Sequence, residues 1–118
     1  MLVSRGDVVL AFVEYVGAPG GKLRPNLVVQ TNVNNHRLNE TIVAVITSNM
    51  AHTHEPTQLL IDVATPDGAA SGLLHDSAVR CERLHTIPQT DIRRIVGKLS
   101  DTLILKIDEC RKAALGIS

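Results

Sequence analysis

The segment from residue 17 to residue 30 joins a turn-forming stretch to an apolar one, and this limits the folds open to the chain. Residues 17–25 contain three glycines and two prolines. These residues disfavour the interior of a helix or strand, because glycine is too flexible and proline removes a backbone donor. Valine-rich residues lie on both sides. We therefore expect two strands joined by a mobile hairpin loop, which carries the cations Lys22 and Arg24 to the start of the second strand.

Apolar runs rich in β-branched residues mark the other expected strands. Residues 8–13 and 41–47 have almost no polar alternation, which is typical of strands buried on both faces. The whole pattern predicts strands at 7–15, 26–31, 41–47, 57–64, 78–87 (as one or two strands) and 96–99. Between them it predicts a polar connection at 32–40 with room for one helical turn, a tight turn at 65–68 and a short helix within 88–95.

The C-terminal residues predict a helix from Asp101 to about Leu115. Ser100 is a good N-cap, Asp101 is favourable at the positive end of the helix, and Gly116 is a natural stop. One face of this helix is apolar and consists of Leu103, Ile107, Cys110 and Ala114.

These elements define a mainly β fold with a C-terminal α-helix, arranged as a small antiparallel barrel or a strongly bent sheet. At 118 residues, the length fits one domain, residues 1–118. Strands that bury both faces in so small a domain need more cover than one core provides. A homodimer interface is therefore expected, and the alternative is that the terminal helix alone supplies the cover.

Composition excludes several classes of function. The formal net charge is zero and aromatic residues make up 2% of the chain, so neither a chain-wide basic field nor an aromatic platform for bases is expected. Any polyanion must be bound by a local patch. The two cysteines, Cys81 and Cys110, have no metal-binding or disulfide spacing. Because no signal peptide or membrane-spanning run is evident, we expect a cytoplasmic protein with no membrane partner.

Strand pairing is expected to bring distant polar residues together. If residues 26–31 and 41–47 form an antiparallel hairpin, Arg24 and Pro25 lie at the same rim as Thr47, Ser48 and Asn49. Pro25 favours an extended Arg24. A planar cation with hydroxyl groups beside it suits a phosphate. Taken alone, the loop would favour a simpler interpretation, in which Arg24 meets only solvent or a surface carboxylate.

A second polar concentration lies in the predicted strand at 78–87. Alternation predicts that Arg80, Glu82 and Leu84 point one way, and that Arg83 and His85 point the other. Arg80 and Glu82 form either a surface ion pair or a general base beside a cation that stabilises an oxyanion. Spacing alone favours the ion pair.

Two histidine-containing stretches are weaker candidates for a functional site. His52 and His54 have metal-ligand character, but no third ligand is in view, so we expect no metal site and no cofactor. The run His75-Asp76-Ser77 has the residue types of a hydrolytic triad. Because adjacent residues do not form triad geometry, we expect this run to be a turn.

Five segments in order resemble the MazF/PemK family of toxin endoribonucleases of toxin–antitoxin modules. The resemblance covers nearly the whole chain. No single motif is decisive, but the occurrence of all five in the same order as in the family makes the resemblance specific. The segments are Arg5–Val8, Gly21–Val29 (GG-x-RP-x-LVV in the family), Ile46–Asn49 (the TS motif), Ser77–Ile87 (DS-x-V-x-CDQIRTI) and Val96–Ser100 (IG-x-LS).

This resemblance implies an SH3-like barrel, a homodimer and metal-independent cleavage of single-stranded RNA. In that reaction the 2′-hydroxyl attacks the adjacent phosphorus and leaves a cyclic phosphate and a 5′-hydroxyl. The resemblance also implies a cognate antitoxin, whose flexible tail covers the RNA groove. By motif position, the resemblance implies that Arg24 and Thr47 bind the phosphate. It also implies that Glu82 is the base and that Arg80 orients Glu82 or stabilises the developing charge. Further contacts with the RNA would come from Lys22, Pro25, Ser48, Asn49, Arg83 and His85.

Some positions depart from the family pattern. Ala18 stands near a first-loop position where some members have histidine, Glu82 replaces the usual aspartate, and Arg83 replaces glutamine. These departures leave open a degenerate member that binds antitoxin or RNA without cleavage. Another alternative is a gyrase-binding toxin of the CcdB type, which is similar in fold. That class acts through a Trp-Gly-Ile C-terminus, and this chain has no tryptophan.

Overall fold

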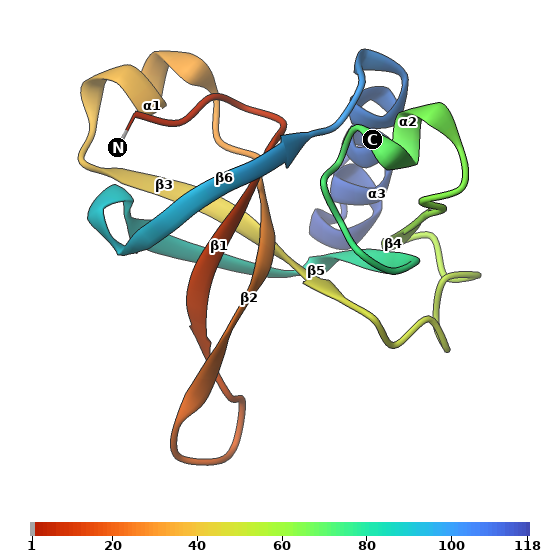
Figure 1. The fold of residues 1–118 in the computed structure, drawn as a ribbon, viewed down its shortest axis with the longest axis horizontal. Helices are drawn as coiled ribbons and strands as arrows, with labels where there is room; N and C mark the ends of the chain where they lie inside the picture. The colour runs from red at the N-terminus through yellow and green to blue at the C-terminus, as the bar shows by residue number, and fades with distance from the viewer. Residues whose placement is uncertain (1) are drawn as a thin grey trace.

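A six-stranded antiparallel sheet and one long helix form most of the structure (Figure 1), a computed structural model that describes residues 2–118. The strand order in the sheet is β4-β5-β3-β2-β1-β6, and the sheet bends into a half-barrel. In chain order the elements are β1 (Asp7–Glu14), β2 (Gly21–Val28), α1 (Asn32–Arg37), β3 (Glu40–Thr47), β4 (Gln58–Ile61), α2 (Pro66–Ala69), β5 (Ser77–Pro88), the 3₁₀ turn η1 (Gln89–Asp91), β6 (Ile92–Lys98) and α3 (Asp101–Leu115).

Both faces of the sheet carry a buried apolar cluster, which explains the strands without polar alternation. On the α3 side, Val8, Leu27 and Ala44 lie side by side in register and pack with Ile107 of the helix. The opposite face contains Val9, Val28 and Val43, and it is closed by Val3 and by Ile92 of β6. The prediction of strands buried on both faces is confirmed. On the second face, Val3 of the N-terminal segment and Ile92 of β6 supply cover from within the chain.

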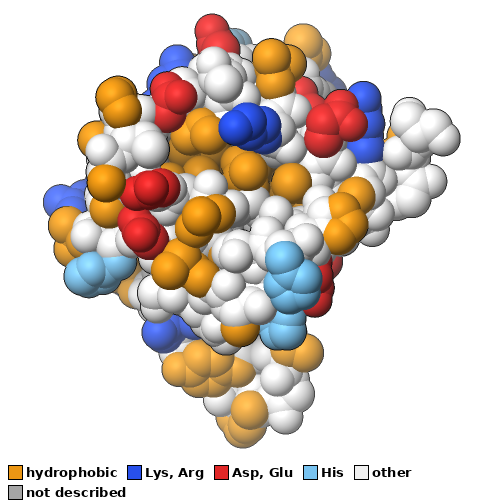
Figure 2. Space-filling view, turned by 90° about the vertical axis from the view of Figure 1, so that its right-hand side faces the viewer, with side chains coloured by type: hydrophobic (Ala, Val, Ile, Leu, Met, Phe, Trp, Pro, Cys, Tyr) orange, Lys and Arg blue, Asp and Glu red, His pale blue; other side chains and the backbone are white. Residues whose placement is uncertain are grey.

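The β1–β2 hairpin is longer than expected, because β2 begins at Gly21 instead of residue 26. The turn is short and closes with a hydrogen bond from Tyr15 N to Gly20 O at 2.8 Å. A Cβ on Gly21 would lie 2.2 Å from Val13 O, so this glycine allows close strand approach instead of marking a loop. The hairpin projects from the sheet (Figure 1), and its tip carries hydrophobic side chains at the bottom of Figure 2.

Three smaller expectations need correction. The strand expected at 57–64 covers only Gln58–Ile61. Residues 65–68 lead into the short helix α2 instead of a tight turn, because the Thr65 hydroxyl caps it by accepting from Gly68 N. The last strand begins at Ile92, so the helix expected within 88–95 shrinks to the three-residue turn η1.

The helix α3 follows the prediction. The Ser100 side chain accepts a hydrogen bond from Leu103 N at 3.2 Å, and Gly116 adopts the left-handed conformation with φ of 69°. Leu103, Ile107 and Cys110 are buried and Ala114 packs against their cluster. Among residues 2–118, no helix is long and apolar enough to cross a membrane.

Candidate functional site

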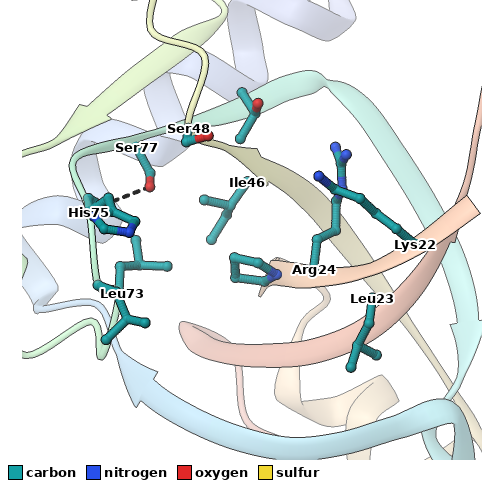
Figure 3. Close-up of a pocket in the computed structure, with 11 residues that line it drawn as sticks. Lys22, Leu23, Arg24, Ile46, Ser48, Leu73, His75 and Ser77 are labelled. Atoms are coloured by element: carbon teal, nitrogen blue, oxygen red, sulfur yellow. Dashed lines mark hydrogen bonds between the residues drawn. The ribbon is translucent and has the colours of Figure 1, made fainter.

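Arg24 and Thr47 lie on the same side of the sheet at the end where β2 and β3 leave their paired region. Asn26 pairs with Val45, so Arg24 and Thr47, each two residues farther along, face the same way as that pair. Both residues line a cavity of about 220 Å³, together with Lys22, Pro25 and Ser48. In Figure 3, Lys22 and Arg24 extend together to one side of β2 and Leu23 to the other. The expected convergence at this rim is therefore present.

Local hydrogen bonds hold both residues. Asn26 is fully buried, and its Nδ2 donates to the Arg24 carbonyl at 2.9 Å, which fixes the backbone under the guanidinium. The backbone N–H of Asn49 donates to Thr47 Oγ1 at 3.1 Å. The Thr47 oxygen is thereby oriented, and its own proton remains available to a ligand. Asn49 does not line the cavity; it contacts the site through this backbone bond.

A register shift in β5 changes which side chains share a face. Val45 pairs with Arg80 but the adjacent Ala44 pairs with Leu84, so three residues of β5 bulge out. Leu84 consequently packs against the α3-side core. His85, which pairs with Val43, returns to the face of Arg80. The expectation that Arg80 and Leu84 point one way and His85 the other is wrong, because the bulge resets the alternation.

Arg83 of β5 lies close to Arg24 of β2, because both line a second pocket under the β1–β2 hairpin. The cavity shared by Arg24 and Thr47 is not itself lined by the β5 residues Arg80, Glu82, Arg83 and His85. Burial lowers the pKa of the Arg83 guanidinium, and the nearby cations Arg80 and Arg24 lower it further, while Glu82 opposes them. The pKa of His85 is also lowered, first by burial and then by Arg83. His85 is therefore neutral at pH 7. Arg83 thus lies near two other guanidinium groups, those of Arg80 and Arg24, and such a group of cations favours an additional anion.

Glu82 is held by two neighbours. Gln58 Nε2 donates to Glu82 Oε2 at 2.8 Å, and Arg80 Nε lies 3.7 Å from Glu82 Oε1. The Arg80 and Glu82 side chains are 31% and 30% exposed. The carboxylate is thus anchored on one oxygen and remains open to solvent and to a substrate.

Several buried polar atoms of this face have no hydrogen-bond partner within residues 2–118. Buried polar groups in folded proteins are normally paired, so a cluster of unpaired ones indicates a missing ligand. Most of them are nitrogen atoms, as an anionic ligand requires. They are Arg24 Nε, Arg80 Nε, Arg83 Nη2 and His85 Nε2, with the oxygens Asn26 Oδ1 and Gln58 Oε1.

Sequence reasoning missed the roles of Gln58 and Asn26. Both are polar residues buried inside strands, and burial of a side-chain amide is visible only when the neighbouring strand is in place. For Asn26 the one available signal was its place directly before the apolar run 27–29. Gln58 is the first residue of β4 and follows a polar loop, so its polarity does not stand out from that of the residues before it.

The two weaker histidine candidates differ in their places: no cavity that contains Arg24 is lined by His52 or His54, whereas His75 lines the cavity of Arg24 and Thr47. His52 pairs with Glu55 at 3.0 Å, and within residues 2–118 no three His, Cys, Asp or Glu side chains gather as a metal site. His75 lines the cavity of Figure 3, and its carbonyl accepts from Ser77 Oγ at 2.8 Å. The prediction of a turn at 75–77 is consistent with this bond.

Comparisons with known proteins agree with the resemblance found in the sequence. Residues 4–115 match the family model described as PemK-like, MazF-like toxin of type II toxin-antitoxin system. Endoribonuclease EndoA of Bacillus subtilis is 31% identical over 118 residues, with 99% of this chain and 97% of that protein covered. Endoribonuclease MazF6 of Mycobacterium tuberculosis is 31% identical over 122 residues, with 99% and 100% covered.

Solved structures show the same fold. Mycobacterium tuberculosis toxin MazF-mt6 superposes with a TM-score of 0.75 at 25% identity, covering 95% of this chain and 98% of that one. A mycobacterial endoribonuclease in complex with its cognate antitoxin gives a TM-score of 0.76 at 19% identity, with 98% and 97% covered. On the extent of the family match and the identity to its relatives, the chain belongs to the PemK-like, MazF-like toxins of type II toxin–antitoxin systems.

Proposed function

We propose that this protein is an endoribonuclease that cleaves single-stranded RNA through the substrate's own 2′-hydroxyl. The observation that carries the proposal is the group of unpartnered buried nitrogens on Arg24, Arg80, Arg83 and His85. Arg80 and His85 pair with Val45 and Val43, which places them on the face of the sheet that Arg24 and Thr47 share. A phosphodiester supplies the anion that these donors lack. Relatives at 31% identity are named endoribonucleases, which supports the same activity here.

The proposed reaction needs no activated side-chain nucleophile. Glu82 takes the proton of the 2′-hydroxyl, whose oxygen bonds to the adjacent phosphorus while the bond from phosphorus to the 5′-oxygen breaks. The leaving oxygen takes up a proton. Arg24 and Thr47 hold the phosphate oxygens, and Arg80 orients Glu82 and stabilises the charge that develops. The products are a 2′,3′-cyclic phosphate and a 5′-hydroxyl, and the chemistry requires neither a metal nor a cofactor.

The remaining site residues contact the RNA on either side of the scissile phosphate. Lys22 and Arg83 add cationic contacts, and neutral His85 offers a hydrogen bond. Pro25 and Ser48 form the wall of the cavity. Asn49 contributes by orienting Thr47.

The biological setting follows from the family. We propose that the protein acts in the cytoplasm, is neutralised by a cognate antitoxin whose tail covers this groove, and works as a homodimer. Antitoxin complexes occur among proteins of the same fold. Large exposed apolar side chains on the hairpin, which are Phe12, Tyr15, Val16 and Leu23, support an interface there.

The deciding experiment incubates the purified protein with single-stranded RNA in EDTA and sequences both fragment ends. We expect cleavage that leaves a cyclic phosphate and a 5′-hydroxyl. Protein carrying Arg24→Ala, prepared in parallel, controls for contaminating ribonucleases. RNA that stays intact while antitoxin or gyrase still binds would identify a toxin that acts by binding alone, and would overturn the proposal.

A further inference from the structure

Gln58 contacts the candidate base from the neighbouring strand. It is the first residue of β4, it pairs with Arg80 of β5, and its side chain is buried at 6% exposure. Its Nε2 donates to Glu82 Oε2 at 2.8 Å. An ionised carboxylate only accepts hydrogen bonds, so the amide nitrogen must face Glu82 and the amide oxygen must face away.

Two complementary atoms are left unpaired beside this contact. Gln58 Oε1 is an acceptor and Arg80 Nε is a donor, both are buried, and neither has a hydrogen-bond partner in the described part of the chain. They belong to directly paired residues of β4 and β5. An unpaired buried polar atom lowers stability. Once Arg80 is no longer attracted to Glu82, a small rotation of the Arg80 side chain that forms a hydrogen bond from Arg80 Nε to Gln58 Oε1 is therefore favourable.

Arg80 is only loosely attached to Glu82. The distance of 3.7 Å between Arg80 Nε and Glu82 Oε1 exceeds hydrogen-bond length. The Arg80 side chain is 31% exposed, and cations crowd this face. An arriving phosphate therefore competes effectively for its guanidinium.

We propose that Gln58 is a positioning residue that keeps Glu82 in place while Arg80 exchanges partners. When RNA binds, Arg80 turns its terminal nitrogens to the phosphate and donates through Nε to Gln58 Oε1. Gln58 Nε2 meanwhile stays bonded to Glu82. The phosphate then neutralises the Arg80 charge, and Glu82 is free to accept the 2′-hydroxyl proton in a fixed orientation. This role rests on the proposed ribonuclease activity and adds a residue that the family motifs did not point to.

The test compares three substitutions at position 58 in the full-length protein. Gln58→Leu and Gln58→Met keep the volume and remove both polar atoms. Gln58→His retains one donor and one acceptor on the neutral ring. Leu60→Ala, two residues along β4 at an exposed side chain, controls for disturbance of the strand. The probes are an RNA that the unmodified protein cleaves and the same RNA with a 2′-deoxy nucleotide at the cleavage site.

We expect Gln58→Leu and Gln58→Met to lower the single-turnover rate roughly 10- to 100-fold. Affinity for the deoxy RNA should stay within about threefold, and Gln58→His should restore most of the rate. A residue that only fills space would leave Gln58→His as slow as the leucine and methionine variants.

The outcomes separate this inference from the proposed function. If the unmodified protein does not cleave RNA, the proposed function fails and the inference with it. If the unmodified protein cleaves RNA and folded Gln58→Leu or Gln58→Met keeps its rate, the inference alone is overturned. A loss of rate that merely follows a loss of affinity for the deoxy RNA, or Gln58→His activity no better than that of the leucine and methionine variants, also overturns it.

Discussion

Asn49 donates its backbone N–H to Thr47 Oγ1 at 3.1 Å, so the Thr47 hydroxyl already uses an acceptor position inside the protein. Its own proton is left for a ligand. The bond thus makes Thr47 a directed donor at the rim of the cavity, and the function of Thr47 should depend on its oxygen more than on its shape.

Replacement of Thr47 by valine tests this dependence. Thr47→Val keeps the β-branched shape and loses the hydroxyl, so we expect the cleavage rate to fall by about 10²-fold or more, as for other lost oxyanion donors. Thr47→Ser keeps the oxygen and should retain most of the activity. Single-turnover rates on RNA measure both, and equal losses in the two variants would show that shape matters more than the hydroxyl.

Removal of the Arg24 guanidinium should abolish efficient cleavage without unfolding the protein. Arg24 has an unpartnered buried Nε and adds to the repulsion on Arg83, so Arg24→Ala loses phosphate stabilisation while it relieves repulsion. We expect the rate to fall about 10²- to 10³-fold with no loss in the melting temperature. Arg37→Ala is the matched control, because Arg37 is exposed on α1 at the other end of β2 and β3. Cleavage at the parent rate by Arg24→Ala would contradict the proposed site.

The close approach of β6 to the segment after α2 should make Gly97 intolerant of a side chain. A Cβ on Gly97 would lie 2.2 Å from the Ser71 carbonyl oxygen. Because this oxygen belongs to the backbone, it cannot move aside as the end of a flexible side chain can. We expect Gly97→Ala to destabilise the fold by about 2–4 kcal/mol, which lowers the melting temperature by roughly 10 °C. Gly17→Ala, where a Cβ meets open space and only the positive φ of 76° is strained, should lose only about 1–2 kcal/mol.

The sequence predicted correctly those elements that are defined by their own residues, either by a continuous run of β-branched residues or by a cap and a stop. The run of β-branched residues at 41–47 places β3 correctly within one residue, because such a run packs well only in a sheet. The cap Ser100 and the stop Gly116 likewise define α3. The start of β2 was missed, because Gly21 looks like a turn residue until the neighbouring strand that requires it is present.

The sequence predicted that Arg24 and Thr47 would lie together, but not how the residues of β5 are arranged beside them. The hairpin of β2 and β3 brought Arg24 and Thr47 together as expected. The shift between Ala44 and Val45 could not be predicted, because a strand's own period of two contains no sign of an insertion relative to its partner. That shift places His85 on the face of Arg80, so the grouping of these two side chains depends on tertiary pairing.

Protonation of His85 should weaken the fold at mildly acidic pH. Its pKa is lowered from 6.5 in the folded protein by burial and by Arg83, so the unfolded state binds the proton more readily. Stability is then full above about pH 6.5 and is lost as the pH falls from there towards the folded pKa. We expect the melting temperature of the unmodified protein to fall over this range more steeply than that of His85→Gln. Parallel curves for the two proteins would show that His85 contributes no such dependence.

Arg83 should illustrate a conflict between RNA binding and stability. Its pKa is lowered by burial, Arg80 and Arg24, which means that the folded protein holds this charge against repulsion. Arg83→Met retains the apolar stem and removes the charge, so the free protein should be as stable as the parent or slightly more stable.

Arg83→Met should also bind RNA more weakly, and the dependence of the affinity on salt concentration tests whether a phosphate contact has been lost. Each phosphate contact to single-stranded nucleic acid adds about 0.7 to the negative slope of log affinity against log salt. Arg83→Met should reduce that slope by roughly this amount, measured with RNA that is 2′-deoxy at the cleavage site. Arg37→Ala should leave the slope unchanged, since this exposed cation lies on α1, away from the cavity. A lower melting temperature with an unchanged slope would instead make Arg83 a structural residue, because the charge would then stabilise the fold and meet no phosphate.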